Sequence, residues 1–277
     1  MTRDEELLAM FSVTQNEVRR AELAAKTPPK IRYIIAITPR SGSSYLCDVL
    51  THTKSLGKPG EMLSRQFIPN YLKVAPAHSS DEYIGQILKA MQTGAASGLK
   101  ASWFQFNDFR MSMQNPDLLT EYRYIYLTRR DLAAQAVSLY RATATDVFHT
   151  NIKHSEEKLK KLKKLRFNYE KIEFWCKHIQ VQELGWCNFF TAHRIYPLCI
   201  NYEEIEDDAA SVVKRIFTYL SIAPPAKPAP VESVFRKLGE RANLRWAGRF
   251  QMQRYDALHP DEASDQQDAE AGQQGAG

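Results

Sequence analysis

The most informative segment of this chain is Ile37-Thr38-Pro39-Arg40-Ser41-Gly42-Ser43-Ser44-Tyr45-Leu46, which directly follows the apolar run Tyr33-Ile34-Ile35-Ala36. The apolar run predicts a buried strand, the polar stretch a tight turn, and the residues after Gly42 the start of a helix. Such a turn directs several backbone N–H groups and the positive helix end at one point, which suits a phosphate or sulfate. Arg40 adds a permanent cation, and Ser41, Ser43 and Ser44 add hydroxyl donors.

The same loop lacks the Walker pattern G-x-x-x-x-G-K-[ST], so the lysine and magnesium arrangement of a nucleoside triphosphatase is not assembled. This absence indicates a site for a nucleotide-linked anion without a triphosphate–magnesium clamp. Taken alone, the loop is equally well explained as an ordinary turn between a strand and a helix, in which Gly42 relieves backbone strain.

A second strand, turn and helix follow one another at residues 123–143. Asp131 is placed to cap the helix 131–143 or to sit in its first turn. Arg130 lies at the helix entrance, and Ser138 follows two turns later. A guanidinium offers forked donors to a phosphate, and a hydroxyl can complete the contact. The simpler interpretation is a surface pair of arginines, Arg129 and Arg130, with a helix serine that faces solvent.

A third segment, Gly57-Lys58-Pro59-Gly60-Glu61-Met62, reads as a loop after the first helix, predicted over residues 43–53. A glutamate in such a loop is usually only solvated. Because the helix 43–53 begins at the candidate anion site, the loop can fold back and bring Glu61 toward that site.

Four motifs occur in order along the chain. They are Pro39-Arg40-Ser41-Gly42-Ser43-Ser44, Gly57-x-Pro59-x-Glu61, Gly98-Leu99-Lys100-x-x-Trp103 and Arg130-Asp131-x-x-x-Gln135-Ala136-Val137-Ser138. In this order they resemble the bacterial trehalose 2-sulfotransferase-like family, and the resemblance to that family continues to about Phe250. Members of that family are carbohydrate sulfotransferases that use 3′-phosphoadenosine 5′-phosphosulfate (PAPS) as the sulfonate donor.

The resemblance implies a role for each matching residue. Arg40, Ser41, Gly42, Ser43 and Ser44 would hold the 5′-phosphate and the sulfonate, and Arg130 and Ser138 the 3′-phosphate. Glu61 matches a general base and Lys100 a catalytic lysine at a strand end. In the wider sulfotransferase group a basic C-terminal segment closes over the nucleotide. The candidates for that contact here are Arg236, Lys237, Arg241, Arg245, Trp246 and Arg249, of which we select Lys237. A solvated basic helix is the alternative for that segment.

The implied chemistry is an in-line displacement in which negative charge grows on the leaving oxygen, so that positioning and electrostatic stabilisation dominate catalysis. Arg40 and the loop N–H groups would receive that charge, and Glu61 would take the proton of a sugar hydroxyl. Arginine and lysine can neutralise the leaving bisphosphate, so no metal is needed. The sequence itself contains no convincing cluster of metal ligands.

The fold class that we predict is α/β, with a P-loop-like central parallel sheet flanked by helices and with helical additions. One sulfotransferase domain is expected over residues 1–255, with an N-terminal helix and linker over 1–27 and a disordered polar tail over 256–277. The predicted strands are 32–38, 98–102, 123–128 and 197–202. Helices are expected over 4–25, 43–53, 81–93, 131–143, most of 155–193, and 207–220.

Composition agrees with a soluble enzyme. The 277 residues carry a net charge of +5, and 44% are hydrophobic. The basic excess suits small anionic ligands and, without an arginine-rich arm or an aromatic RNA motif, does not indicate nucleic acid. We expect a cytoplasmic protein, because the start lacks a secretory apolar region and no run can span a bilayer. The four cysteines form no C-x-x-C pair and are expected to be buried free thiols in a reducing cytosol.

Several points stay open at this stage. The helix expected near residues 153–165 is either a solvated amphipathic helix or a basic rim that attracts an anionic glycolipid or membrane surface. Met62 and Leu63 stand where the family often has aromatic residues, which puts the identity of the acceptor in doubt. A homodimer is suggested only by the resemblance. The rival functions are a P-loop small-molecule kinase and a non-catalytic nucleotide- or glycan-binding protein.

Overall fold

The computed structural model describes residues 3–13, 16–148, 154–225 and 240–259, which divide into two compact units. The first unit comprises Met1–Arg130 and Ile179–Phe235, and the second comprises Asp131–His178 and Arg236–Gly277. The helix α9 (Tyr169–Ala192) belongs to both. The other elements of the first unit are α1 (Arg3–Phe11), α2 (Glu17–Ala25), β1 (Ile31–Ile37), α3 (Ser43–His52), α4 (Ile68–Leu72), α5 (Ser80–Met91), β2 (Ala96–Ser102), α6 (Trp103–Met111), η1 (Pro116–Glu121), β3 (Arg123–Thr128), β4 (Leu198–Asn201) and α10 (Tyr202–Leu220). The second unit also holds α7 (Leu132–Thr145), α8 (Glu156–Lys164) and α11 (Glu240–Leu258).

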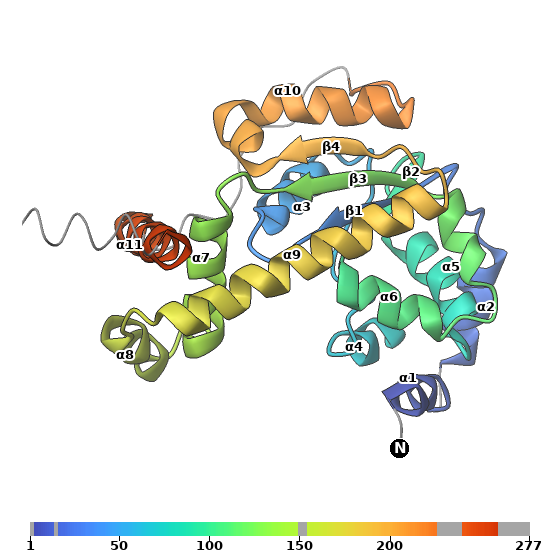
Figure 1. Ribbon diagram of the computed structural model, residues 1–277. Coiled ribbons are helices and arrows are strands. Elements are labelled where there is room, and N and C mark those ends of the chain that lie inside the picture. Colours follow the sequence, from blue (N-terminus) through green and yellow to red (C-terminus); the bar gives the residue numbers. More distant parts are fainter. Residues whose placement is uncertain (1–2, 14–15, 149–153, 226–239, 260–277) are drawn as a thin grey trace, which may run out of the picture. The chain divides into compact units, whose positions relative to one another are not determined.

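The strands of the described residues form one parallel sheet in the order β2-β1-β3-β4 (Figure 1). Ile37, at the end of β1, stands opposite Ser102 of β2 and Leu127 of β3, so these strands end at the same edge. From β1 the chain moves first to β2 on one side and then to β3 and β4 on the other. The strand order therefore reverses between β1 and β3, and ligands of open α/β sheets usually bind beyond the carboxyl ends of the strands at such a point. The predicted α/β fold with a P-loop-like parallel sheet is confirmed.

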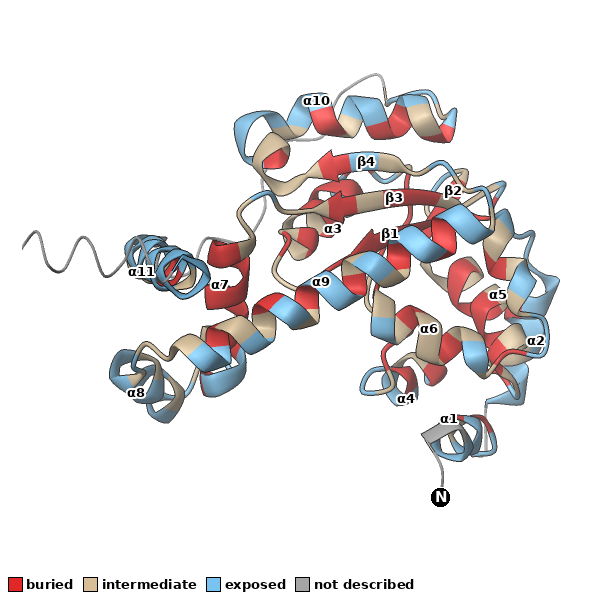
Figure 2. Ribbon diagram, in the orientation of Figure 1, coloured by how far each residue is buried: buried red, intermediate tan, exposed pale blue. Residues whose placement is uncertain are grey.

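Both faces of the sheet are covered, which explains why β1 reads as a continuous apolar run. Ile34 and Ala36 belong to a core on one face that includes Trp186, Phe189 and Phe190 of α9. Ile35 and Ile37 belong to a core on the other face, together with buried residues of α3 and α10. Figure 2 shows buried residues along the strands of the sheet, which lie between the helices that cover its two faces. The sheet is therefore a rigid base for the loops at its carboxyl edge.

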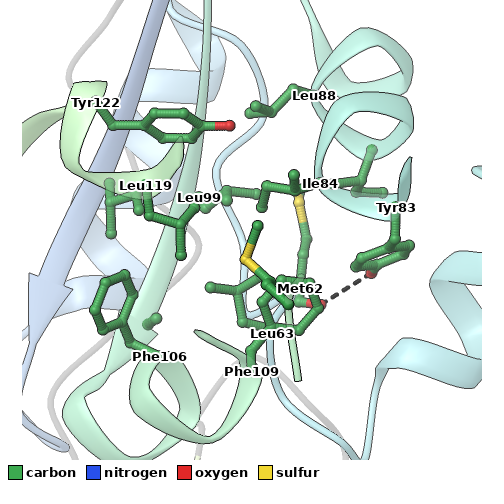
Figure 3. Close-up of a cluster of buried hydrophobic side chains, with 14 of the residues drawn as sticks. Met62, Leu63, Tyr83, Ile84, Leu88, Leu99, Phe106, Phe109, Leu119 and Tyr122 are labelled. Atoms are coloured by element: carbon green, nitrogen blue, oxygen red, sulfur yellow. Dashed lines mark hydrogen bonds between the residues drawn. The ribbon is translucent and has the colours of Figure 1, made fainter. Parts of the chain in front are cut away.

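The loop after α3 is anchored in the first of these cores (Figure 3). Met62 and Leu63 are buried among side chains that include Ile84, Leu99 and Phe109. The hydroxyl of Tyr83 donates a hydrogen bond to the carbonyl of Met62 at 2.9 Å. The two residues that follow Glu61 therefore pack into the core, and Glu61 is attached to a fixed point.

In the second unit, α7 and α11 pack against each other. The rings of Tyr140 and Trp246 stack with centroids 6.2 Å apart, and Arg141 donates to Asn243 Oδ1 at 2.6 Å. Asp131 caps α7 by accepting the N–H of Ala134 at 2.8 Å, which is the first of the two positions that the sequence predicts for it. The helix α11 extends to Leu258, inside the segment expected to be a polar tail.

Some predicted elements need correction. The single helix predicted over 4–25 is wrong, because α1 ends at Phe11 and a second helix, α2, is capped by Asn16, whose side chain accepts the N–H of Arg19. The helix α10 starts at Tyr202, before the predicted residue 207, and its backbone breaks at Asp208. The helix α6, directly after β2, was not predicted. The predicted bounds of the strands and of α3, α5 and α7 differ from the observed ones by at most two residues.

Candidate functional site

The loop after β1 has the backbone of an anion-binding turn. Arg40 and Gly42 both have positive φ, +69° and +79°, so the chain bends sharply twice within three residues. Gly42 precedes α3 and provides no side-chain cap to its first turn. Ser41 is fully buried, and its Oγ has no hydrogen-bond partner among the described residues. An uncapped helix start beside a buried hydroxyl donor fits a phosphate or sulfonate oxygen.

Arg40, the cation of this loop, is partly buried. Burial, followed by the positive charge of Arg129, lowers the pKa of Arg40 to about 10. Arg40 therefore stays charged at neutral pH, but its charge is poorly solvated. An anion in the loop would offset the free-energy cost of burying the Arg40 charge. It would also reduce the repulsion between Arg40 and Arg129.

Tyr202, the first residue of α10, joins two loops of the site. Its ring packs on Gly42, and the guanidinium carbon of Arg129 lies 4.7 Å above the ring centroid. The Tyr202 hydroxyl donates to Glu206, which fixes the ring. The chain segments that follow β1, β3 and β4 therefore meet at one ring. Neither Arg129 nor Tyr202 was among the predicted site residues.

Lys100 connects the anion loop to Glu61. Its Nζ lies 3.3 Å from Ser44 Oγ in the first turn of α3 and 2.9 Å from Glu61 Oε1. The residue is only 5% exposed. Burial by itself lowers the pKa of Lys100, but the acidic groups of Cys47 and Glu61 outweigh burial, and the pKa is raised overall. A buried, charged lysine therefore bridges the loop and the carboxylate.

Glu61 has a second donor that we did not predict. Gln105 of α6 donates from Nε2 to Glu61 Oε2 at 3.1 Å. Gln105 is also part of a capping box with Ser102, the last residue of β2. The Ser102-x-x-Gln105 spacing is the known signal of such a box and could have revealed α6, although not the contact with Glu61.

Arg130 lies at the same edge of the sheet, two residues after the end of β3. Its backbone N–H donates to Glu203 Oε2 at 3.2 Å, and its guanidinium lies 3.8 Å from Glu204 Oε1. The Arg130 side chain is 63% exposed, so its donors are accessible to a ligand. Arg215 also pairs with Glu204, at 2.5 Å, and therefore shares that carboxylate with Arg130.

The remaining predicted residues lie elsewhere. Ser138 belongs to the second unit, where it is buried on α7. Lys237 lies outside the described residues. In the described part of the chain, His, Cys, Asp and Glu side chains form no group of three that could hold a metal ion. The same residues include no helix with the length and apolar composition needed to cross a membrane.

Comparison with known proteins gives two matches in sequence. The model of the family described as Stf0 sulphotransferase matches residues 113–253. This segment contains Arg130 and Ser138, whereas the anion loop, Glu61 and Lys100 precede it. The chain is also 23% identical to trehalose 2-sulfotransferase of Mycobacterium tuberculosis (strain ATCC 35801 / TMC 107 / Erdman), in an alignment that covers 79% of this chain and 93% of that protein.

Two solved structures are also similar. The sulfotransferase domain from the curacin biosynthetic pathway has a TM-score of 0.46 and 15% identity, over 79% of this chain and 83% of that one. A sulfotransferase from Alicyclobacillus acidocaldarius has a TM-score of 0.46 and 14% identity, over 84% of this chain and 96% of that one.

Proposed function

Because this chain belongs to the Stf0 sulphotransferase family, we propose that it moves a sulfonate group from PAPS to a hydroxyl of a saccharide or glycolipid. The acceptor class is proposed from the trehalose 2-sulfotransferase to which the chain is 23% identical. The donor is proposed from the anion loop and from the positions of Arg40 and Arg130.

The observation that carries the proposal is the pair of contacts made by Lys100. One buried ammonium group reaches Ser44, in the anion loop, and Glu61, the carboxylate of the neighbouring loop. A sulfotransferase needs an anion site and a proton acceptor next to each other, because the proton leaves the acceptor hydroxyl as the sulfonate is transferred. A simple turn would not need a buried cation between the two loops.

In the proposed reaction, Glu61 takes the proton from the acceptor hydroxyl while the hydroxyl oxygen attacks sulfur. A new S–O bond forms to the acceptor, the S–O bond to the 5′-phosphate breaks, and the electron pair of that bond stays on the phosphate oxygen. Arg40 and the N–H groups at the start of α3 stabilise the growing charge on that oxygen. Lys100 lies between the anion loop and Glu61, and its ammonium group stabilises negative charge on the bound donor or on the Glu61 carboxylate.

The part of the site that distinguishes PAPS from an ordinary adenine nucleotide is the 3′-phosphate contact. We assign it to Arg130 and Ser138, with Lys237 as a further contact. The exposed guanidinium of Arg130 supports this assignment, because it can turn from Glu204 to a doubly charged phosphate, which is the stronger partner.

Calorimetry without metal tests the donor. We expect 3′,5′-bisphosphoadenosine to bind at least about tenfold more tightly than AMP or ATP, because each charge-assisted hydrogen bond contributes about 1.5–3 kcal/mol. A preference for ATP, or a dependence of binding on Mg²⁺, would instead support the small-molecule kinase. Sulfonate transfer from PAPS to trehalose is then measured directly. Nucleotide or sugar binding without transfer to any hydroxyl acceptor would support a binding protein.

A further inference from the structure

We propose that Gln105 is a positioning residue, which holds the Glu61 carboxylate in the orientation that a general base needs. The inference rests on the proposed function, because that function assigns Glu61 the role of base. It adds a residue that the four sequence motifs do not contain.

The first argument is that both oxygens of Glu61 have their own donor. Lys100 Nζ lies 2.9 Å from Oε1, and Gln105 Nε2 donates to Oε2 at 3.1 Å. The Glu61 side chain is 31% exposed, so without such contacts it could rotate into solvent. A single donor leaves the carboxylate plane free to turn about the contact, whereas two donors from different elements fix it. A fixed carboxylate presents its remaining lone pairs in one direction.

The second argument concerns the orientation of the Gln105 amide. Its Oε1 accepts the backbone N–H of Ser102 at 2.9 Å, and Ser102 Oγ accepts the backbone N–H of Gln105 at 3.4 Å. Because the amide oxygen is used in this capping box, the NH₂ group must point away from the Ser102 backbone, and there it meets Glu61. The capping box between the end of β2 and the start of α6 therefore determines that Glu61 meets the NH₂ group of the Gln105 amide and not its oxygen.

The third argument is the choice of residue type. A capping box accepts Glu as well as Gln at this position, and a negative charge in the first turn of a helix is favourable. Glutamate would therefore serve the helix at least as well. It would also place a second carboxylate against Glu61, with no donor between them. The amide is thus required by the contact with Glu61 and not by the helix cap.

The test uses Gln105→Glu, which keeps the capping acceptor and removes the donor to Glu61. Repulsion between the two carboxylates should lower the melting temperature slightly, and the Kd for 3′,5′-bisphosphoadenosine should change much less than kcat. With PAPS and trehalose, kcat should fall by about 10- to 100-fold. The acid limb of the kcat profile should move to higher pH, because a neighbouring carboxylate disfavours ionised Glu61.

Ser102→Ala is the matched control for the helix cap, because it removes the capping hydroxyl and leaves the Gln105 amide. Its melting temperature should fall by several degrees, which is about the effect of a lost cap. The acid limb of its kcat profile should stay at the wild-type pH, because no carboxylate is added beside Glu61. If Gln105→Glu leaves both kcat and the pH profile as in the wild type, the proposal is overturned and Gln105 only caps α6.

A second readout is independent of turnover. The ¹³C signal of the Glu61 carboxyl, assigned by its loss in Glu61→Gln, is titrated in the wild type and in Gln105→Glu. A higher midpoint in the variant supports the contact, and an unchanged midpoint overturns it. If the wild type transfers no sulfonate to trehalose, the proposed acceptor fails, whereas the titration still decides on Gln105.

Discussion

The ring of Tyr202 lies directly against Gly42, at the start of α3. A Cβ built on Gly42 would stand 2.8 Å from Tyr202 Cε2 and closer still to Cδ2. No side chain fits at this position unless the ring moves, and the ring is held by the hydrogen bond to Glu206 and lies beneath the Arg129 guanidinium. The shape of the anion loop therefore depends on a residue 160 positions later in the sequence.

Gly42→Ala should therefore damage both stability and nucleotide binding. A methyl group at φ +79° is strained and collides with the Tyr202 ring, so we expect a loss of about 2–4 kcal/mol in the free energy of unfolding. Urea denaturation measures this loss, and calorimetry should show weaker binding of 3′,5′-bisphosphoadenosine.

Gly85→Ala, inside α5, is the control for this prediction. Apart from the two chain neighbours and the nearby backbone of α5 itself, no described atom lies within 4 Å of a Cβ at Gly85. That variant should gain about 0.5–1 kcal/mol from its higher helix propensity. Equal stability of the two variants would contradict the importance of the contact between Gly42 and Tyr202.

Glu61→Gln should separate binding from turnover. The variant cannot accept the acceptor's proton, so we expect kcat to fall by about 10²- to 10⁴-fold, with the Kd of 3′,5′-bisphosphoadenosine changed little. Glu121→Gln removes a carboxylate from an exposed pair with Arg32 and serves as the control. Full activity of Glu61→Gln would exclude Glu61 as the base.

Arg130→Ala should weaken the 3′-phosphorylated nucleotide selectively. We expect the Kd of 3′,5′-bisphosphoadenosine to rise by about 10- to 100-fold and that of AMP to change little, because only the first has a phosphate for this guanidinium. Arg32→Ala, at the opposite end of β1, makes the same change in charge and should affect neither ligand. Equal weakening of both nucleotides by Arg130→Ala would remove Arg130 from the 3′-phosphate site.

The cysteines should differ in reactivity. Burial raises the pKa of Cys47 to about 11, and because the thiolate is the reactive form, Cys47 should be almost unreactive at pH 8. The burial predicted for all four cysteines is wrong for Cys187 and Cys199, which are exposed, and Cys187 should react first with iodoacetamide. Cys199 is also exposed as a residue, but its thiol group is partly buried, and this burial raises the pKa of the thiol. Cys199 should therefore react more slowly than Cys187. Peptide mass spectrometry measures the order, and early labelling of Cys47 in the folded protein would contradict it.

Sequence patterns predict the parts of this fold that are local. The apolar run at residues 33–36 and the breaker Gly42 are enough to place β1, its turn and α3, and Asp131 marks the start of α7. Contacts that depend on strand order are not local. Tyr202 meets Gly42 because β3 and β4 lie on one side of β1, and no pattern near either residue contains that information.

Other failures came from signals that are present in the sequence. Asn16 marks the start of α2 by the capping preference of its side chain, and Ser102 with Gln105 marks the start of α6. The contact of Gln105 with Glu61 is different, since it joins a helix start to a loop 44 residues earlier. The sequence could suggest Glu61 as a base but not the residues that hold it.

The position of Lys100 has a consequence for how mutations combine. A single ammonium group touches Ser44 on one side and Glu61 on the other, so the two residues share a partner although they lie on different segments. Energetic effects of substitutions that share a partner do not add. The double variant Ser44→Ala/Glu61→Gln should therefore lose less activity than the product of the losses in the two single variants. When the same substitutions are made in Lys100→Met, which lacks the shared partner, their effects on activity should multiply.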